Sequence, residues 1–169
     1  MRGIVQGLHP VVGHLIRATE QIREDVRAAI GDLTPGQIWS TPYGMTSAGF
    51  HAKHLAGSTE RLSTYLAGQQ LTAEQLAAID AEKEGNATAA ELLASIDAAL
   101  GHYSKLILSM GPTDFESVRE VGRKRYRVAA IGVAIHIAEH AQRHIGGMIA
   151  AAKLVRVISP WADTSRTTF

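Results

Sequence analysis

The run His136-Ile-Ala-Glu-His140-Ala-Gln-Arg-His144 is the most informative stretch of this sequence. It lies inside Val128–Val155, a segment rich in alanine and without proline, which predicts a long helix. Residues four apart on a helix lie on one face, about 5–6 Å from each other. Either His136 and His140, or His140 and His144, can therefore direct two rings at one point. Because neutral imidazole is the commonest metal-binding side chain, the run predicts part of a metal site, to be completed by a ring from another helix.

Composition narrows the class of protein. The chain has 169 residues, enough for one domain with a core of its own, which we predict over residues 1–159, followed by a polar tail over residues 160–169. A net charge of +1 gives no electrostatic reason to expect nucleic acid or a membrane surface as a partner. The absence of cysteine excludes disulfides, a cysteine-held iron–sulfur cluster and a thiol nucleophile of the chain's own. Without an apolar run of signal-peptide or membrane-spanning length, we expect a soluble, cytoplasmic protein.

Apolar residues recur at helical spacing in three further long segments. The predicted helices run from about Pro10 to Ile30, Thr46 to Leu66, Thr88 to Met110, and Val128 to Val157. Capping-box patterns begin at Thr34, Thr72 and Thr88. The second of these starts a short helix within Gly68–Gly85. The predicted fold is therefore all-α, a four-helix bundle with a longer, helix-containing connection between its second and third helices.

The segment Thr113–Tyr126 is predicted to be irregular or briefly extended. Together with the residue that follows it, this segment is unusually basic, with cationic side chains at Arg119, Arg123, Lys124, Arg125 and Arg127. Such a patch can bind an anionic group of a substrate. A solvated loop is the simpler explanation, and we favour it.

The other histidines and the carboxylates give weaker signals. His51 and His54 lie three apart on the second predicted helix, and only one of them need be a ligand. Taken alone, His54 reads as a packed core residue, because Leu55, Ala56 and Gly57 follow it. We interpret His9, His14 and His102 as surface or structural residues, and Glu60 and Glu139 as solvated carboxylates or groups that support a ligand. No general base is assigned.

One alternative pairing has a motif of its own. His136-x-x-Glu139-His140 matches the inverted zincin pattern of metalloproteases, with the glutamate as general base. That class needs a distant carboxylate ligand, and no convincing candidate exists in the sequence. We therefore prefer the pairing of His140 with His144.

Three stretches carry a resemblance to a known family. They are Leu33-Thr-Pro-Gly-Gln-Ile-Trp-Ser-Thr-Pro-Tyr43, His54-Leu-Ala56, and the run from His136 to Met148. With them, the chain resembles the DinB/YfiT-like superfamily of four-helix-bundle metalloenzymes over most of residues 8–157. The family follows its His-x3-His pattern with Arg-Gly-Gln. Here Ile145 and Gly147 stand in place of Arg and Gln, which affects the surroundings of the site more than the metal.

The resemblance implies a function as well as a fold. The ligands that it implies for a divalent ion, nickel or zinc, are His54, His140 and His144. His136 would line the site or support one of the ligands. Three histidines leave a coordination position open for water or substrate.

Two reactions fit such an open position. The resemblance implies a homodimer that acts on a small molecule, either as a metal-dependent hydrolase or as a transferase that uses a low-molecular-weight thiol such as bacillithiol or mycothiol. Because the chain has no cysteine, that thiol would be a cosubstrate. The alternative from another class is a non-catalytic, stress-related bundle that binds a ligand or a partner, with its metal structural or absent.

Overall fold

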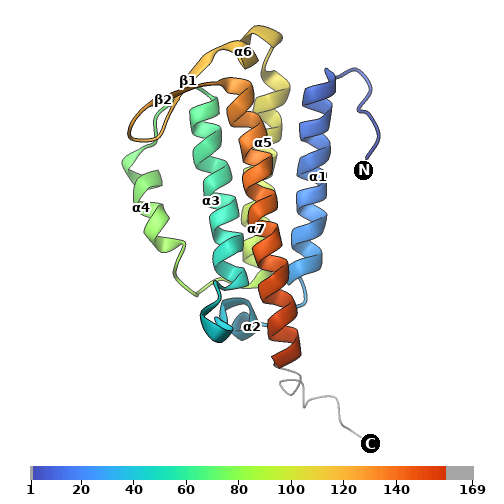
Figure 1. Cartoon of the computed structure of the whole chain (residues 1–169), viewed down its shortest axis with the longest axis vertical. Helices are drawn as coiled ribbons and strands as arrows, with labels where there is room; N and C mark the ends of the chain where they lie inside the picture. The colour runs from blue at the N-terminus through green and yellow to red at the C-terminus, as the bar shows by residue number, and fades with distance from the viewer. Residues whose placement is uncertain (1, 159–169) are drawn as a thin grey trace, which may run out of the picture.

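Four long helices dominate the computed structural model, which describes residues 2–158 (Figure 1). They are α1 (Pro10–Ile30), α3 (Ala48–Leu66), α5 (Ala89–Ser109) and α7 (Ala130–Ile158). Both α1 and α3 pack against α5 and α7, so the helices close into a bundle with α1 and α3 on one diagonal. The predicted all-α four-helix bundle is confirmed.

The direction of the chain explains the long connection after α3. Figure 1 shows that α3 and α5 run in one direction, while α1 and α7 run in the other. The chain that leaves α3 at Leu66 must therefore return along the bundle before α5 can begin. The short helix α4 (Ala73–Ala81) makes this return beside α3, as the helix-containing connection predicted over Gly68–Gly85 requires.

Local hydrogen bonds set the starts of three helices, as the sequence predicts. Each of α2 (Pro35–Trp39), α4 and α5 begins with a threonine whose hydroxyl accepts a hydrogen bond from the backbone N–H three residues later. The later side chain accepts in turn from the threonine N–H, which satisfies two backbone donors that the helix leaves free. The three pairs are Thr34–Gln37, Thr72–Gln75 and Thr88–Glu91. A single 3-10 turn, Pro42–Gly44, separates α2 from α3.

The segment before α7 is more regular than predicted. After the short helix α6 (Pro112–Glu116), the strands β1 (Val118–Val121) and β2 (Tyr126–Ala129) form an antiparallel hairpin. The expectation of a brief extended segment is right, but α7 begins at Ala130 rather than at Val128. Val128 pairs with Arg119 in the ladder, so its backbone is extended. The order of apolar residues alone does not distinguish a strand end from a helix start here.

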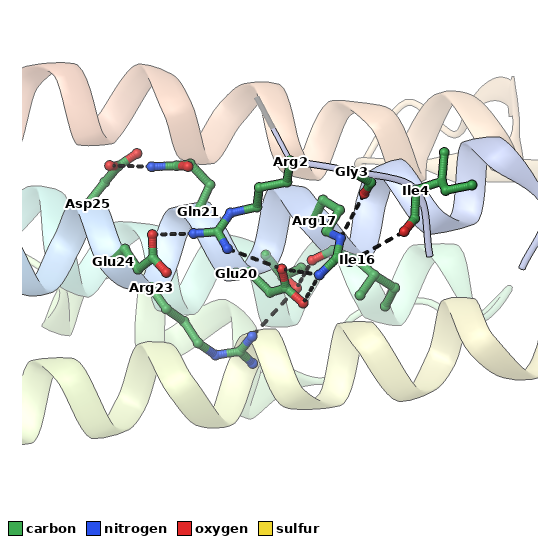
Figure 2. A network of polar contacts seen from close by, with 11 residues as sticks. Arg2, Gly3, Ile4, Ile16, Arg17, Glu20, Gln21, Arg23, Glu24 and Asp25 are labelled. Carbon is green, nitrogen blue, oxygen red and sulfur yellow. Dashed lines mark hydrogen bonds and ion pairs between the residues drawn. The ribbon is translucent and has the colours of Figure 1, made fainter. Parts of the chain in front are cut away.

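The N-terminal residues are tied to α1 by charged side chains. Figure 2 shows the guanidinium of Arg2 between Glu20 and Glu24, with Arg17 beside it. The Nε of Arg17 donates to the carbonyl oxygen of Gly3 over 3.0 Å, and its Nη1 donates to Glu20. The segment that precedes Pro10 therefore lies along the outer face of α1.

Two further predictions concern the chain as a whole. The polar tail predicted for residues 160–169 lies outside the described residues. Within residues 2–158, no helix combines the length and the hydropathy that crossing a membrane requires.

The buried core of the bundle forms two clusters, and one of them contains the most deeply buried phenol, that of Tyr103. Tyr103 of α5 is 1% exposed and packs with Val133 and Ile137 of α7. Its hydroxyl donates to the carbonyl oxygen of Ala134 over 2.8 Å, which satisfies the donor. Burial raises the pKa of Tyr103, so the phenol stays protonated and keeps this bond.

We predict that Tyr103→Phe lowers the free energy of unfolding by about 1 kcal/mol, because the ring still fills its site while one buried hydrogen bond is lost. Urea denaturation followed by circular dichroism measures the change. Tyr126→Phe is the matched control, since Tyr126 is 63% exposed. An equal loss in both variants would contradict the assignment of this stabilisation to the buried bond.

Candidate metal centre

Three histidines from two helices meet at the contact between α3 and α7. His54 lies on α3, and His140 and His144 lie one turn apart on α7. One ring nitrogen of each lies within 4.8 Å of the other two. The ring centroids of His54 and His144 are 4.5 Å apart, and those of His140 and His144 are 4.6 Å apart. The structure thus brings together all three residues that the resemblance implies as ligands.

Each of these rings uses its Nδ1 atom for a contact outside the group. Nδ1 of His54 is 2.7 Å from Oε2 of Glu82. Nδ1 of His140 is 3.3 Å from Oγ of Ser58, and Nδ1 of His144 is 3.0 Å from Nδ1 of His51. The Nε2 atoms have no partner of this kind among the described residues. In each ring, Nε2 is therefore the nitrogen left to bind a cation.

The hydrogen-bond directions are compatible with this arrangement. The hydroxyl of Ser58 donates to the carbonyl oxygen of Leu55 over 3.2 Å, so its oxygen can accept the Nδ1–H of His140. An imidazole that carries its proton on Nδ1 has its lone pair on Nε2. The same tautomer of His144 donates to His51. All three rings can thus present a lone pair at once.

Burial keeps two of the rings uncharged. Partial burial, followed by repulsion from the neighbouring rings, lowers the pKa of His140 to about 4, and the same causes lower the pKa of His144 to about 4. Burial and the proximity of His54 also lower the pKa of His51. At neutral pH, His140 and His144 are therefore neutral imidazoles, the form that binds metal ions.

Glu82 is the residue in contact with the histidine group that the sequence does not reveal. It follows α4, is 6% exposed, and also accepts a hydrogen bond from Nη1 of Arg61 over 2.5 Å. Burial raises the pKa of Glu82, but the hydrogen bonds from His54 and Arg61 lower it more, so the carboxylate stays ionised. In the sequence it stands in Ala81-Glu-Lys-Glu84, which reads as a solvated charge run. No local pattern distinguishes it from its neighbours.

Two glycines give the contacting side chains room. A Cβ atom on Gly57 would overlap Oε1 of Glu82, and one on Gly147 would lie 2.5 Å from Nε2 of His51. Neither glycine has a positive φ, so what matters at each is the missing side chain. Gly147 stands where the family resemblance implies Gln. Because Gly147 has no side chain, the ring of His51 can lie there, beside His144.

The remaining candidate residues lie outside the group. His136 is one turn from His140, with ring centroids 5.7 Å apart, but its side chain is 52% exposed and it does not join the three. The inverted zincin pairing is thus not the arrangement that forms. Glu139 and Glu60 are exposed, and His9 caps α1 by accepting from the N–H of Val11.

The basic stretch is far from the histidines. Nε of Arg119 donates to the carbonyl oxygen of Leu66, and Nη1 of Arg125 lies 3.3 Å from Oε2 of Glu120. Leu66 is twelve residues along α3 from His54, which corresponds to about 18 Å. The protein itself thus binds the side chains of Arg119 and Arg125. A small substrate at the histidines would not span the distance to this stretch. The solvated hairpin is the better explanation.

A groove of about 1020 Å³ lies between α3, α4 and α5. Its wall includes Gly57, Arg61 and Glu82, but none of the three histidines. The residues that line the groove include alanines at positions 56, 67, 78, 81, 98 and 99. The Glu82–Arg61 pair therefore links the groove to the histidine group, because both residues line the groove and Glu82 contacts His54.

Comparison with known proteins places the chain in a family. No curated protein matches it. Among solved structures, YfiT from Bacillus subtilis, described as "a probable metal-dependent hydrolase with an unusual four-helix bundle topology", has a TM-score of 0.65 and 14% sequence identity. The match covers 92% of this chain and 94% of that chain, and at this identity it shows a common fold. The model of the DinB superfamily matches residues 18–148, well over half of the sequence, and the protein belongs to the DinB superfamily.

Proposed function

We propose that this protein is a divalent-metal-dependent hydrolase in which His54, His140 and His144 bind the ion through Nε2. The observation that carries the proposal is the convergence of three ring nitrogens within 4.8 Å, each ring held by a separate Nδ1 partner. Membership of the DinB superfamily and the likeness to YfiT, described as "a probable metal-dependent hydrolase", support the reaction class. Nickel and zinc both suit imidazole ligands.

The donor set fits a catalytic rather than a structural ion. Structural zinc is usually closed by four protein ligands, whereas catalytic zinc has three and an open position. Within residues 2–158, no fourth histidine, aspartate or glutamate completes the group. The side chain of His54 is 24% exposed, so solvent reaches the edge of the group. These features support a position at which a small substrate can bind.

The side chains of the site have distinct roles in this proposal. When bound, a divalent cation supplies a Lewis acid that polarises a carbonyl oxygen and acidifies water. His140 and His144 hold it as neutral ligands, since burial keeps them unprotonated at neutral pH. Ser58 and His51 fix the orientation of those two rings. An ester or amide of a small molecule is the substrate class that this arrangement suits.

Thiol-dependent transfer is the second candidate for the same open position. A thiolate is a good ligand for zinc, and the chain contains no cysteine of its own. The sulfur would therefore come from a low-molecular-weight cosubstrate, as the family resemblance implies.

The assembly and the compartment are also part of the proposal. The family resemblance implies a homodimer, and the absence of cysteine suits the cytoplasm, which is a reducing compartment. Light scattering coupled to size-exclusion chromatography would show a mass of two chains, whereas a mass of one chain would contradict the dimer.

We predict that the purified protein binds Zn²⁺ or Ni²⁺ and that the double variant His140→Ala, His144→Ala does not. Removing two of three ligands leaves a single imidazole, which cannot hold the ion against dilution. Metal analysis after purification without chelator measures the content. The double variant His14→Ala, His102→Ala is the matched control, because it also removes two histidines but leaves the group intact. Negligible metal in both the unchanged protein and the site variant would overturn the proposed ligands.

We predict that metal-loaded protein hydrolyses small model esters without added thiol. The double variant at His140 and His144 should lose roughly 100-fold or more of this rate, because several kcal/mol of Lewis-acid stabilisation are lost. Rates of nitrophenol release with and without low-molecular-weight thiols provide the measurement. A strict requirement for thiol would reject simple hydrolysis in favour of transfer.

A further inference from the structure

The connection between α3 and α5 has a single buried residue, and that residue is charged. From Ala67 to Thr88, every side chain is exposed or half-buried except that of Glu82. The helix within this connection, α4, has no buried residue at all. A segment that docks on a bundle normally buries apolar side chains. This connection instead inserts a carboxylate.

Burial of that carboxylate requires a specific explanation. An ionised carboxylate out of water is costly unless it is paired and hydrogen-bonded. Arg61, whose side chain is 11% exposed, donates to Oε1 of Glu82 and balances its charge. The second oxygen, Oε2, is directed at Nδ1 of His54. An ion pair with Arg61 accounts for the charge, but not for this second contact.

The contact with His54 fixes where the ring carries its proton. An ionised carboxylate can only accept hydrogen bonds, so Nδ1 of His54 must be the donor. In the neutral ring, the lone pair is then on Nε2, the nitrogen left to bind a cation. Gly57, three residues along α3, has no side chain that would keep Glu82 from this position.

Glu82 differs in kind from the other two Nδ1 partners. His140 contacts the hydroxyl of Ser58, and His144 contacts the ring of His51, which burial keeps neutral. Only His54 has an anionic partner. A carboxylate bonded to the far nitrogen of a ligand ring fixes its tautomer and strengthens it as a donor to the metal.

We propose that Glu82 is a positioning residue that fixes His54 as the strongest of the three metal ligands. Arg61 holds the carboxylate of Glu82 by an ion pair, and the missing side chain of Gly57 gives it room. The inference rests on the proposed metal-binding function, and it adds a residue that lies on neither ligand-bearing helix. The same contact joins the α4 connection to the proposed metal site, so this carboxylate contributes both to docking of the connection and to the grip on the ion.

A purely structural role for Glu82 is the rival explanation, and the chain offers a matched control for it. Nζ of Lys53 donates to the carbonyl oxygens of Ala81 and Glu84 and to Oδ1 of Asn86, at 2.8–3.1 Å. Lys53 thus anchors the same connection to α3 but contacts no histidine. Lys53→Met removes this anchor and keeps an apolar stem of similar length.

The test compares Zn²⁺ affinity, measured by competition with a chromophoric chelator, for the unchanged protein, Glu82→Ala, Glu82→Gln and Lys53→Met. We expect Glu82→Ala to weaken Zn²⁺ binding by roughly 10- to 100-fold. Glu82→Gln should lose less, because its amide oxygen can still accept from Nδ1 of His54. Lys53→Met should bind as the unchanged protein does. Equal losses in Glu82→Ala and Lys53→Met, or no loss in Glu82→Ala, would overturn the proposal.

A second readout does not depend on metal. The ¹⁵N chemical shifts of the His54 ring in the metal-free protein report which nitrogen is protonated. We expect Nδ1–H in the unchanged protein and in Glu82→Gln, and loss of that preference in Glu82→Ala. An unchanged tautomer in Glu82→Ala would reject the positioning role. If the unchanged protein bound no Zn²⁺, the proposed function would fail, while the tautomer result would still decide whether Glu82 orients His54.

Discussion

Small side chains bring α3 and α7 close together, and the arrangement of the histidines follows from that contact. Ala52 and Ala56 of α3 share one buried cluster with Ala141 and Ala152 of α7, together with Leu55 and Met148. Interiors packed at this density leave little freedom for the backbone. The rings at the edge of the contact are therefore held near one another before any ion binds. Apolar packing, rather than the polar groups themselves, sets the spacing of the site.

The parallel course of α3 and α5 has a consequence for the site. Because both helices run in the same direction, the chain must return along the bundle between them. The return brings Glu82 into contact with His54 of α3. A bundle with a short turn at this place would have no residue there. Among residues 2–158, the topology thus supplies an anionic partner for one of the three histidines, His54. The docked connection is held mainly by polar contacts, from Lys53, Arg61 and His54.

At the two positions where the sequence departs from the family pattern, neighbouring residues fit the replacement. Ile145 stands where the resemblance implies Arg, and it is 2% exposed within the core. Gly147 stands where it implies Gln, and the ring of His51 occupies the space that a side chain would fill. Nδ1 of His51 in turn contacts His144. The Nδ1 partner of the His144 ring therefore comes from α3, while His144 itself lies on α7.

Much of this fold can be predicted from the sequence, because a helix is determined by interactions between residues close together along the chain. The spacing of apolar residues, the three capping boxes and the His-x3-His pattern depend on neighbours within a few positions, and they correctly predict the long helices and two rings on one face. Long-range proximity has no such signature. That His54 meets His140 and His144, that His51 reaches His144, and that Glu82 is buried among exposed residues all depend on how the helices pack. Residues more than twenty positions apart along the chain meet only after packing has fixed the helices, so their contacts belong to the tertiary structure.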